Sequence, residues 1–495
     1  RASAVHKRDK RWFRAKDPMK PDQSVPVAVV SRPKAKYPEL PPFDPPNPIY
    51  EMVEAVLRDL GFDRARSGTP DWNPLGDLIA PGDRVVLKPN FVASKNFHQP
   101  LHGDKLLCSS TPGSVLRPLL DYALRATGPA GQVTIVDTPV EGCNVTDVLR
   151  GLGIDQLIAY YRERGHSVEF IDLRYFQIVP RMVLDDVRRH GRSLNLGMLV
   201  RESLPGDPLG YRVVDLGSRS RFASVEQRAD RYRFHRSHKY TPQPHHSGGK
   251  HEYSIPRTVL AADCILNLAK LKTHKKSGVT LACKSVIGLT NEKYWLPHYT
   301  AGTPAEDGDE FPFWPPLAVR MENQLQRFPM PLGHSLVARA PKLVDPQNGM
   351  VRGYILEGSW EGNDTIWRTI LDLGEIVLHT GKDGVLRDTP QRRYLTLIDG
   401  IIGGEGEGPL ASTPRHSGLL LASQDPVLAD LVATRLMGFD PSRVKTITEG
   451  LRRPILPSSK EAALVVSMNG VPPSGAFKPP STWPSLLRPT PEANR

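Results

Sequence analysis

Residues 267–298, NLAKLKTHKKSGVTLACKSVIGLTNEKYWLPH, decide the fold of this chain and the position of any functional site. An apolar run at 263–268 leads into this stretch and is typical of a buried strand. Lysines and a histidine then crowd residues 270–276, and Gly278 lets the backbone turn. From Val279 the pattern is helical. A strand, a basic hinge and a helix in this order place side chains at the carboxyl edge of an α/β sheet, where ligands bind.

Two side chains of this stretch, His274 and Lys284, have small or apolar neighbours that would partly bury them. On the predicted helix, Thr280 and Lys284 lie on one face, one turn apart. A buried amine needs a reason, such as an anion, a covalent partner or a metal-bound ligand. The alternative for both side chains is a purely structural role. For Lys275 and Lys276 the simpler interpretation is a solvent-exposed edge.

Apolar runs alternate with helical patterns along the rest of the chain. The predicted strands cover residues 25–31, 84–88, 132–137, 168–173, 394–398, 418–422 and 463–467. The predicted helices include 49–61, one capped by Thr111 with Pro112 as its first residue, 145–164, 365–380, and 427–437 capped by Asp425. This alternation predicts an α/β fold, a mainly parallel sheet with helices on both faces.

Composition divides the chain into segments. We expect a flexible basic arm (1–24), an N-terminal α/β part (25–179), a long basic insertion (180–256), a C-terminal α/β part (257–470) and a Pro-rich tail (471–495). A second, smaller α/β lobe is compatible with this division. The net charge of +12 resides in residues 1–20 and 218–250, each of which carries +6. Basicity is therefore a property of the arm and the insertion, and the rest of the fold is neutral.

Right-handed crossovers would bring the carboxyl ends of the strands to one edge of the sheet. We expect one side of that edge to bind anions and move protons, with His274, Lys284 and Lys272 as its catalytic residues. The residues expected to bind a cofactor are Lys88, Asn90, Gly278, Thr280, Gly404 and Gly406.

The glycine-rich segment at 401–410, IIGGEGEGPL, fits neither GxGxxG nor a Walker pattern, and its two carboxylates would repel phosphates. Its glycines allow a close backbone approach. Glu405 and Glu407 suit a metal, a substrate hydroxyl or a lysine ammonium, and together with Asp399 they form the predicted acidic side of the site. The alternative is a tight surface turn with solvated glutamates.

Several classes of protein are disfavoured. No run approaches the roughly 18 apolar residues of a membrane span. The four cysteines lie far apart, so the chain carries no iron–sulfur or zinc motif. His245, His246 and His251 lack the regular spacing of a metal site. We expect a cytoplasmic protein, while a leader removed before Arg1 would leave the same sequence.

Five blocks in this order resemble the family called domain of unknown function 362, often found beside ferredoxin-type clusters. They are RVVLKPNFV at 84–92, STPGSVLRPLL at 110–120, ILNLAKLKTHKKSGVTLACKSVIGL at 265–289, LIDGIIGGEGEGP at 397–409 and SQDPVLADLVATRLMGFDP at 423–441. The resemblance covers about 84–441 and implies a separate redox partner. The chain departs from the pattern in its missing cluster cysteines and its long insertion.

A fainter resemblance is to nickel-pincer lactate racemase and its relatives. His274, Gly278, Lys284, Gly288 and His298 are similar in kind and order to that family's motif. The resemblance implies that His274 is an acid–base residue, Lys284 anchors a nickel-pincer-like cofactor and His298 binds the metal. Val279 and Thr280 stand where the family has its second glycine.

These observations predict an enzyme that binds an anionic small molecule or cofactor, with racemase-like or redox-linked chemistry. A nucleic-acid or phosphopolymer binder would instead use the basic arm and the insertion, in which arginines and aromatic side chains alternate. The insertion is equally explained as a surface loop. A third possibility is a scaffold that loads a cofactor into a partner.

Overall fold

The computed structural model describes residues 27–39, 41–96, 99–181, 198–234, 244–314, 344–345, 350–351, 354–355, 357–459, 464–471 and 474–487. The arm at 1–24 lies outside the described residues, as do residues 182–197 and 235–243 of the insertion. In the part that is described, no helix is long and apolar enough to cross a membrane.

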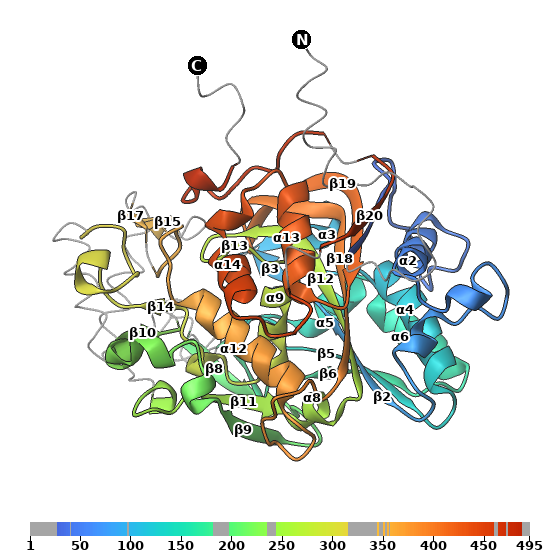
Figure 1. Cartoon of the computed structure of the whole chain (residues 1–495), viewed down its shortest axis with the longest axis horizontal. Helices are drawn as coiled ribbons and strands as arrows, with labels where there is room; N and C mark the ends of the chain where they lie inside the picture. The colour runs from blue at the N-terminus through green and yellow to red at the C-terminus, as the bar shows by residue number, and fades with distance from the viewer. Residues whose placement is uncertain are drawn as a thin grey trace, which may run out of the picture.

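A nine-stranded sheet runs through the centre of the protein in the order β20-β1-β19-β18-β12-β2-β5-β6, with β13 added to β12 (Figure 1). Neighbours in this order are parallel except those of β19, which runs antiparallel to β1 and β18. The predicted α/β fold with a mainly parallel sheet is therefore confirmed. The strands are β1 (Val27–Ser31), β2 (Arg84–Pro89), β5 (Gln132–Asp137), β6 (Val168–Asp172), β12 (Cys264–His274), β13 (Gly278–Val279), β18 (Arg393–Glu407), β19 (Ala411–Ser423) and β20 (Val466–Asn469).

Helices cover both faces of this sheet, as expected for parallel strands joined by crossovers (Figure 1). On one face pack α2 (Pro48–Asp59), α4 (Gly113–Thr127), α5 (Val145–Gly151) and α6 (Ile154–Glu163). On the other lie α9 (Leu281–Ser285), α12 (Ile366–His379), α13 (Pro426–Leu436) and α14 (Lys445–Arg452). The N-terminal and C-terminal parts thus share one sheet.

Smaller elements surround this core. The short helices are α3 (Gly103–Leu107) and α8 (Arg257–Ala261). Small antiparallel sheets are made by β3 (Lys95–Asn96) with β4 (Gln99–Pro100), β7 (Phe176–Arg181) with β8 (Met198–Ser203), β9 (Tyr211–Asp215) with β11 (Glu252–Pro256), β10 (Tyr232–Arg233) with β14 (Tyr299–Thr300), and β15 (Val344–Asp345), β16 (Met350–Val351) and β17 (Tyr354–Ile355).

The helix caps show how local sequence starts these elements. The Asp425 side chain accepts from the backbone N–H groups of Val427 and Leu428, which confirms the predicted cap of α13. Thr111 does not cap α4, although the sequence suggested it. Its hydroxyl donates to the carbonyl of Leu268 at 2.9 Å and so ties the loop before α4 to β12.

The central stretch differs from its prediction in one respect that matters for the site. β12 continues to His274, so the expected basic hinge is part of a strand. Its Lys270, Lys272 and His274 alternate with apolar Ala269 and Leu271, and strand geometry puts the three basic residues on one face. Apolar neighbours and hydrogen-bonding partners at the end of β12 allow the strand to continue through its basic residues. Strand propensity alone does not reveal these partners.

Three further expectations are corrected. The helix expected from Val279 is short: β13 comes first, then α9 and a 3-10 turn at Val286–Leu289. The glycine-rich segment is not a loop but the end of β18, which pairs with β19 as far as Glu407. Lys275 is buried at 8 % exposure and Lys276 is half-buried, so neither lies on the expected solvent-exposed edge.

A fully buried ion pair joins β12 to β18. Lys270 Nζ lies 2.7 Å from Asp399 Oδ2, and both side chains are completely inaccessible to solvent. The Tyr37 hydroxyl donates to the same carboxylate at 2.7 Å. Burial, followed by the charge of Asp399, raises the pKa of Tyr37 well above its usual value. Because neither charge can reach water, each depends on the other.

We expect Asp399→Asn to lower the free energy of unfolding by about 3–5 kcal/mol, because it leaves the Lys270 ammonium buried without a countercharge. Urea unfolding at pH 7 measures this change. Asp383→Asn, which breaks the exposed pair with Arg387, should change the stability far less, because water screens that pair. Equal effects of the two substitutions would contradict the assigned role of the buried pair.

Candidate functional site

The end of β12 and the two segments that follow it form a cluster of basic side chains at the carboxyl edge of the sheet. His274, the last residue of β12, pairs with Gly278 of β13 across a tight turn. Gly278 has φ +76°, and a Cβ there would lie 2.9 Å from the Trp483 ring. Only glycine suits both constraints, so this residue fixes the turn that presents His274.

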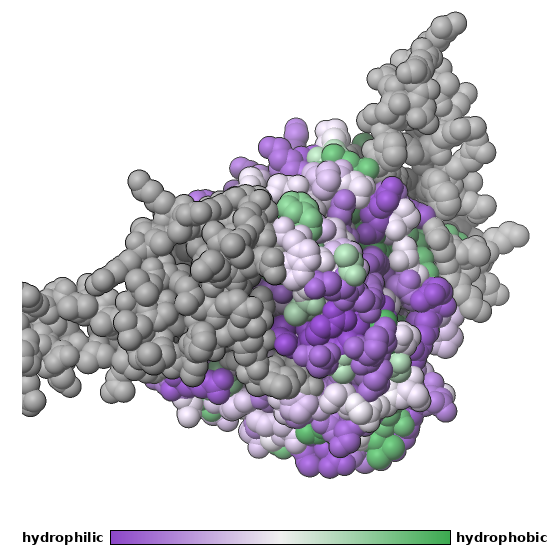
Figure 2. Space-filling model, turned by 90° about the vertical axis from the view of Figure 1, so that its left-hand side faces the viewer, coloured by the Kyte–Doolittle hydropathy of each residue, from purple (hydrophilic) through white to green (hydrophobic). Residues whose placement is uncertain are grey.

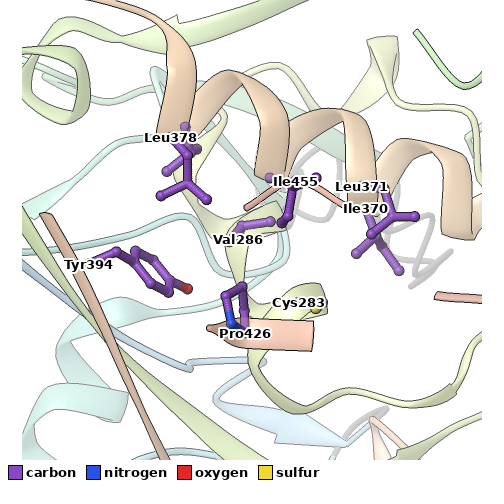
Figure 3. A pocket seen from close by; sticks show the side chains of 10 residues that line it. Cys283, Val286, Ile370, Leu371, Leu378, Tyr394, Pro426 and Ile455 are labelled. Atoms are coloured by element: carbon purple, nitrogen blue, oxygen red, sulfur yellow. The ribbon is translucent and has the colours of Figure 1, made fainter. Parts of the chain in front are cut away.

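The short helix α9 carries Lys284 and is held at its start by one carboxylate. Asp430 accepts from the backbone N–H of Ala282 at 2.7 Å and from that of Cys283 at 3.0 Å. In Figure 3, side chains of α12 stand over Cys283 and Val286. The cavity between them is about 10 Å³, too small for a ligand. It is packing that anchors the apolar side of α9.

Lys284 has no hydrogen bond and no ion pair among the described residues, although its side chain is half-buried. Burial, and then the charges of Lys293 and Lys276, lower its pKa to about 7. An amine with this pKa is a mixture of neutral and charged forms at neutral pH. It is the functional candidate with the fewest structural ties in this region.

His274 has a defined tautomer. Its Nδ1 accepts from the backbone N–H of Lys276 at 3.1 Å, so in the neutral ring the proton is on Nε2. The side chain is 7 % exposed. Burial, and then the charge of Lys284, lower its pKa well below the usual value, so the ring is neutral at pH 7.

His298 has the opposite tautomer. Its Nδ1 lies 3.0 Å from the carbonyl of Leu296, which can only accept, so Nδ1 carries the proton and Nε2 keeps a lone pair. The ring meets Phe234 edge-on, with centroids 4.6 Å apart. Burial, and then Lys276, lower its pKa well below the usual value. The two histidines therefore offer one hydrogen-bond donor and one acceptor.

Lys272 is fully buried and has no carboxylate within 4 Å in the described part of the chain. Its Nζ donates to Asn90 Oδ1 at 2.6 Å and to the carbonyl of Ser109 at 2.5 Å. Burial, followed by the charge of Lys284, lowers its pKa well below the usual value. The predicted proximity of Asn90 and Lys272 is present, and Lys272 also holds the loop before α4.

Lys88 lies on the other face of the sheet from Lys272. It pairs in register with Asn267, whose side chain contacts the backbone of Ala282. Its Nζ is 3.0 Å from Asp137 Oδ1, and both side chains are buried. A Cβ at Gly288 would lie 2.1 Å from the same oxygen. Gly288 thus makes room for an ion pair, and Lys88 has a structural partner of its own.

The predicted acidic side does not face the basic cluster as one group. Asp399 pairs with Lys270. Glu405 accepts from the backbone N–H of Lys478 at 3.1 Å, and Glu407 from that of Ser481 at 2.7 Å. Glu405 and Glu407 thus tie the C-terminal segment to β18, and Glu407 also lies 3.6 Å from Lys275, a lysine partner of the kind expected for it. Among the described residues, no group of three His, Cys, Asp or Glu is placed to hold a metal ion.

The glycines of β18 allow close packing. Gly404 pairs with Lys272 in the sheet, and a Cβ on it would lie 2.9 Å from the Lys272 Cβ. The carbonyl of Gly406 accepts from the Thr273 hydroxyl at 2.8 Å. The glycine-rich segment therefore lies along the central stretch, where it supports β12.

Sequence reasoning missed part of the cluster. Lys293 donates to the carbonyls of Thr138 and Pro139, and burial lowers its pKa to about 8. Lys276 lies 3.8 Å from Glu357. Their position inside residues 267–298 was the only available signal. Buried hydroxyls without a hydrogen-bond partner also occur in the segments that meet here, namely Ser110, Thr138 and Thr280.

Comparison with known proteins finds a family match over a part of the chain that contains the central stretch. Residues 218–435 match the family model "Domain of unknown function (DUF362)". This part of the chain is a DUF362 domain. The match begins later than the resemblance at about 84–441 and contains β12, α9, β18 and most of α13. The basic cluster belongs to the DUF362 domain, whereas Asn90 and Ser109 come from outside it.

Two individual proteins are similar to the chain. A thylakoid-associated protein of Synechocystis is 33 % identical over 94 residues, which are 19 % of this chain and 27 % of that protein. The match therefore spans about a quarter of the relative's length. A crystal structure of a Thermotoga maritima protein aligns with 81 % of this chain and 58 % of its own, at 10 % identity and a TM-score of 0.33.

We expect Lys284→Met to raise the free energy of unfolding at pH 7, on the order of 1–4 kcal/mol, as when other buried charged groups are replaced by apolar ones. The pKa of Lys284 is about 7 in the folded protein and about 10.4 when unfolded. The unfolded chain therefore binds more protons between these values. Burying the charged Lys284 amine lowers the free energy of unfolding by its full amount below pH 7. This loss of stability disappears as the pH rises toward about 10.4.

Chemical denaturation of wild type and Lys284→Met from pH 6 to 10 tests this. Lys382→Met, at an exposed lysine paired with Asp263, is the matched control. If Lys284→Met stabilises the protein as much at pH 10 as at pH 7, then folding does not lower the pKa of Lys284.

Proposed function

We propose that the chain is an enzyme that binds an anionic small molecule at the carboxyl edge of the sheet and transfers a proton there. The observation that carries this proposal is a set of buried or half-buried cations that lack a matching carboxylate. Among the described residues, Lys272, Lys284 and Lys293 have no carboxylate within 4 Å. Repulsion between these lysine charges destabilises the folded protein unless a ligand supplies the opposite charge.

A carboxylate or a phosphate would supply that charge. The unpartnered hydroxyls of Ser110, Thr138 and Thr280 suit the polar atoms of such a ligand. The most similar arrangement in enzymes is an apolar-walled site with a few convergent polar groups. The ligand would lie close to His274 and His298, since Lys284 acts on the pKa of both.

The histidine tautomers indicate what the site does to its ligand. The His274 Nε2–H can donate a hydrogen bond to a carbonyl oxygen and stabilise negative charge on it, as a neutral imidazole does in known isomerases. The His298 Nε2 lone pair can remove a proton from the neighbouring carbon. The bound anion would offset the lysine charges and raise the pKa of His298, so the base becomes stronger when substrate is present. This supports isomerase-like chemistry.

A nickel-pincer-like cofactor would use the same residues. The free amine of Lys284 would hold it, and the lone pair on His298 Nε2 is available for a metal. Such a group supplies hydride transfer to and from a substrate carbon when bound. Glu405 and Glu407, also considered as metal ligands, are engaged with the C-terminal segment.

The described arginines of the insertion do not favour a nucleic-acid binder. Arg228 contacts Asp307 at 2.5 Å and Asp364 at 2.8 Å. Arg219 and Arg221 both reach Glu375. These arginines hold the insertion against α12 and its neighbouring segments. Carboxylates of the same protein already neutralise their charges, so the charges are not available to a polyanion. The described surface in Figure 2 is mostly hydrophilic with small scattered hydrophobic areas, so this face shows no broad apolar docking patch.

We expect malonate and inorganic phosphate to raise the melting temperature of the protein and uncharged glycerol at equal concentration to have little effect. The anion stabilises the folded state in proportion to its affinity for the site. Lys284→Ala should weaken malonate binding about tenfold or more, and Lys382→Ala should leave it unchanged. An anion effect that is the same in both variants would contradict the proposed site.

Malonate binding should also take up protons at pH 8, because a nearby negative charge raises the pKa of Lys284 from about 7. Calorimetry in two buffers with different ionisation enthalpies measures the uptake, and Lys284→Met should reduce it. The titratable and charged groups that act on the cluster are Lys88, Lys270, Lys272, Lys276, Lys284, Lys293, Arg174, His274, His298, Cys108, Cys143, Asp137, Glu141, Asp309, Glu310 and Glu357. Proton release on binding would contradict the assignment.

A further inference from the structure

We infer that Lys284 is a nucleophile that forms an imine with the carbonyl group of an anionic substrate, such as a 2-oxo acid or a phosphorylated aldehyde. This inference rests on the proposed function, because the anion site would deliver the carbonyl to the amine. It goes further in assigning a covalent role to one residue and a functional group to the substrate.

The first support is the isolation of the Lys284 side chain. Lysines that serve structure in this protein have defined acceptors: Lys270 has Asp399, Lys88 has Asp137 and Lys293 has two carbonyls. Lys284 has no hydrogen bond or ion pair among the described residues. Its amine is free to react, and the Asp430 contacts to α9 fix the backbone that carries it.

The second support is the electrostatic surroundings. The charges that act most on Lys284 are Lys293 and Lys276, and both are positive. Cationic neighbours and desolvation favour the neutral amine, which is the nucleophilic form. The same cationic neighbours can pair with the anionic group of the substrate, which leaves the neutral Lys284 amine to attack the carbonyl carbon.

The third support is the pair of histidines, which provide what imine formation needs. The Lys284 lone pair attacks the carbonyl carbon, a C–N bond forms, and the carbonyl π electrons move to oxygen, where the His274 Nε2–H donates a hydrogen bond. His298 Nε2 takes a proton from the new ammonium and returns it to the oxygen. One further proton from solvent lets the C–O bond break with loss of water, and the nitrogen lone pair forms C=N.

This step requires no oxidant or reductant. The amine, the carbonyl compound and one proton give a protonated imine and water. The positive imine then withdraws electrons from the adjacent carbon, whose proton His298 can remove. The same residues therefore serve both the covalent step and the proposed isomerase-like chemistry.

The test uses the full chain with glyoxylate, a small anionic aldehyde, and sodium borohydride, which reduces an imine to a stable secondary amine. At pH 7 we expect one adduct per chain, located at Lys284 by peptide mass spectrometry and formed at least tenfold faster than at any other lysine. Lys284→Arg should lose this adduct and Lys382→Arg should keep it. Propionaldehyde, which has no charge, should label Lys284 at least tenfold more slowly than glyoxylate does.

The outcomes separate this inference from the proposed function. Labelling spread over many lysines, or unchanged in Lys284→Arg, overturns the inference. So does a native protein whose Lys284 already carries a cofactor mass. If malonate still raises the melting temperature through Lys284 while glyoxylate is not trapped, the anion site stands and the covalent role fails. Should Lys284→Arg not fold, Lys284→Met, expected to be more stable than wild type, replaces it.

Discussion

The structure depends on keeping charged side chains of one strand away from water. β12 is central in the sheet, between β18 and β2, yet it carries Lys270, Lys272 and His274. A charge in such a place is tolerated only with a countercharge, with strong hydrogen-bond acceptors, or in its neutral form. The strand uses all three: Asp399 for Lys270, Asn90 and a backbone carbonyl for Lys272, and a neutral ring for His274.

This constraint also explains the elements around β12. The end of β18 supplies Asp399 and then runs along β12 with glycines, because a side chain at Gly404 would collide with Lys272. The loop before α4 supplies the acceptors for Lys272, and Thr111 ties that loop to β12. The second half of the central stretch returns over the strand end with α9, Lys293 and His298. The part of the sheet that holds the charges is therefore also where basic side chains converge.

Lys284 stands apart within this arrangement. The other buried lysines have partners that stabilise the fold, so their chemistry is fixed by structure. Lys284 sits on a short helix whose backbone is held by Asp430 and whose apolar side packs under α12, while its amine has no partner in the described part of the chain. A rigid backbone with a free, destabilised functional group is what a reacting residue requires. The unpaired Lys284 amine lowers the stability of the folded protein, and such a loss is expected where a side chain reacts with a ligand.

Local sequence patterns were enough to predict the α/β class, the strands of the central sheet, most of its helices and the Asp425 cap of α13. These follow from periodicity and local hydrogen bonding, which act over a few residues. Sequence periodicity could not show that β12 continues through its basic residues, since lysines normally mark the end of a buried strand. Only the tertiary structure paired Lys270 with Asp399, separated Lys88 from Lys272 by the sheet, and set the opposite tautomers of His274 and His298. Each of these depends on partners far away in the chain or on the exact path of the backbone, because burial and charge are properties of the folded neighbourhood.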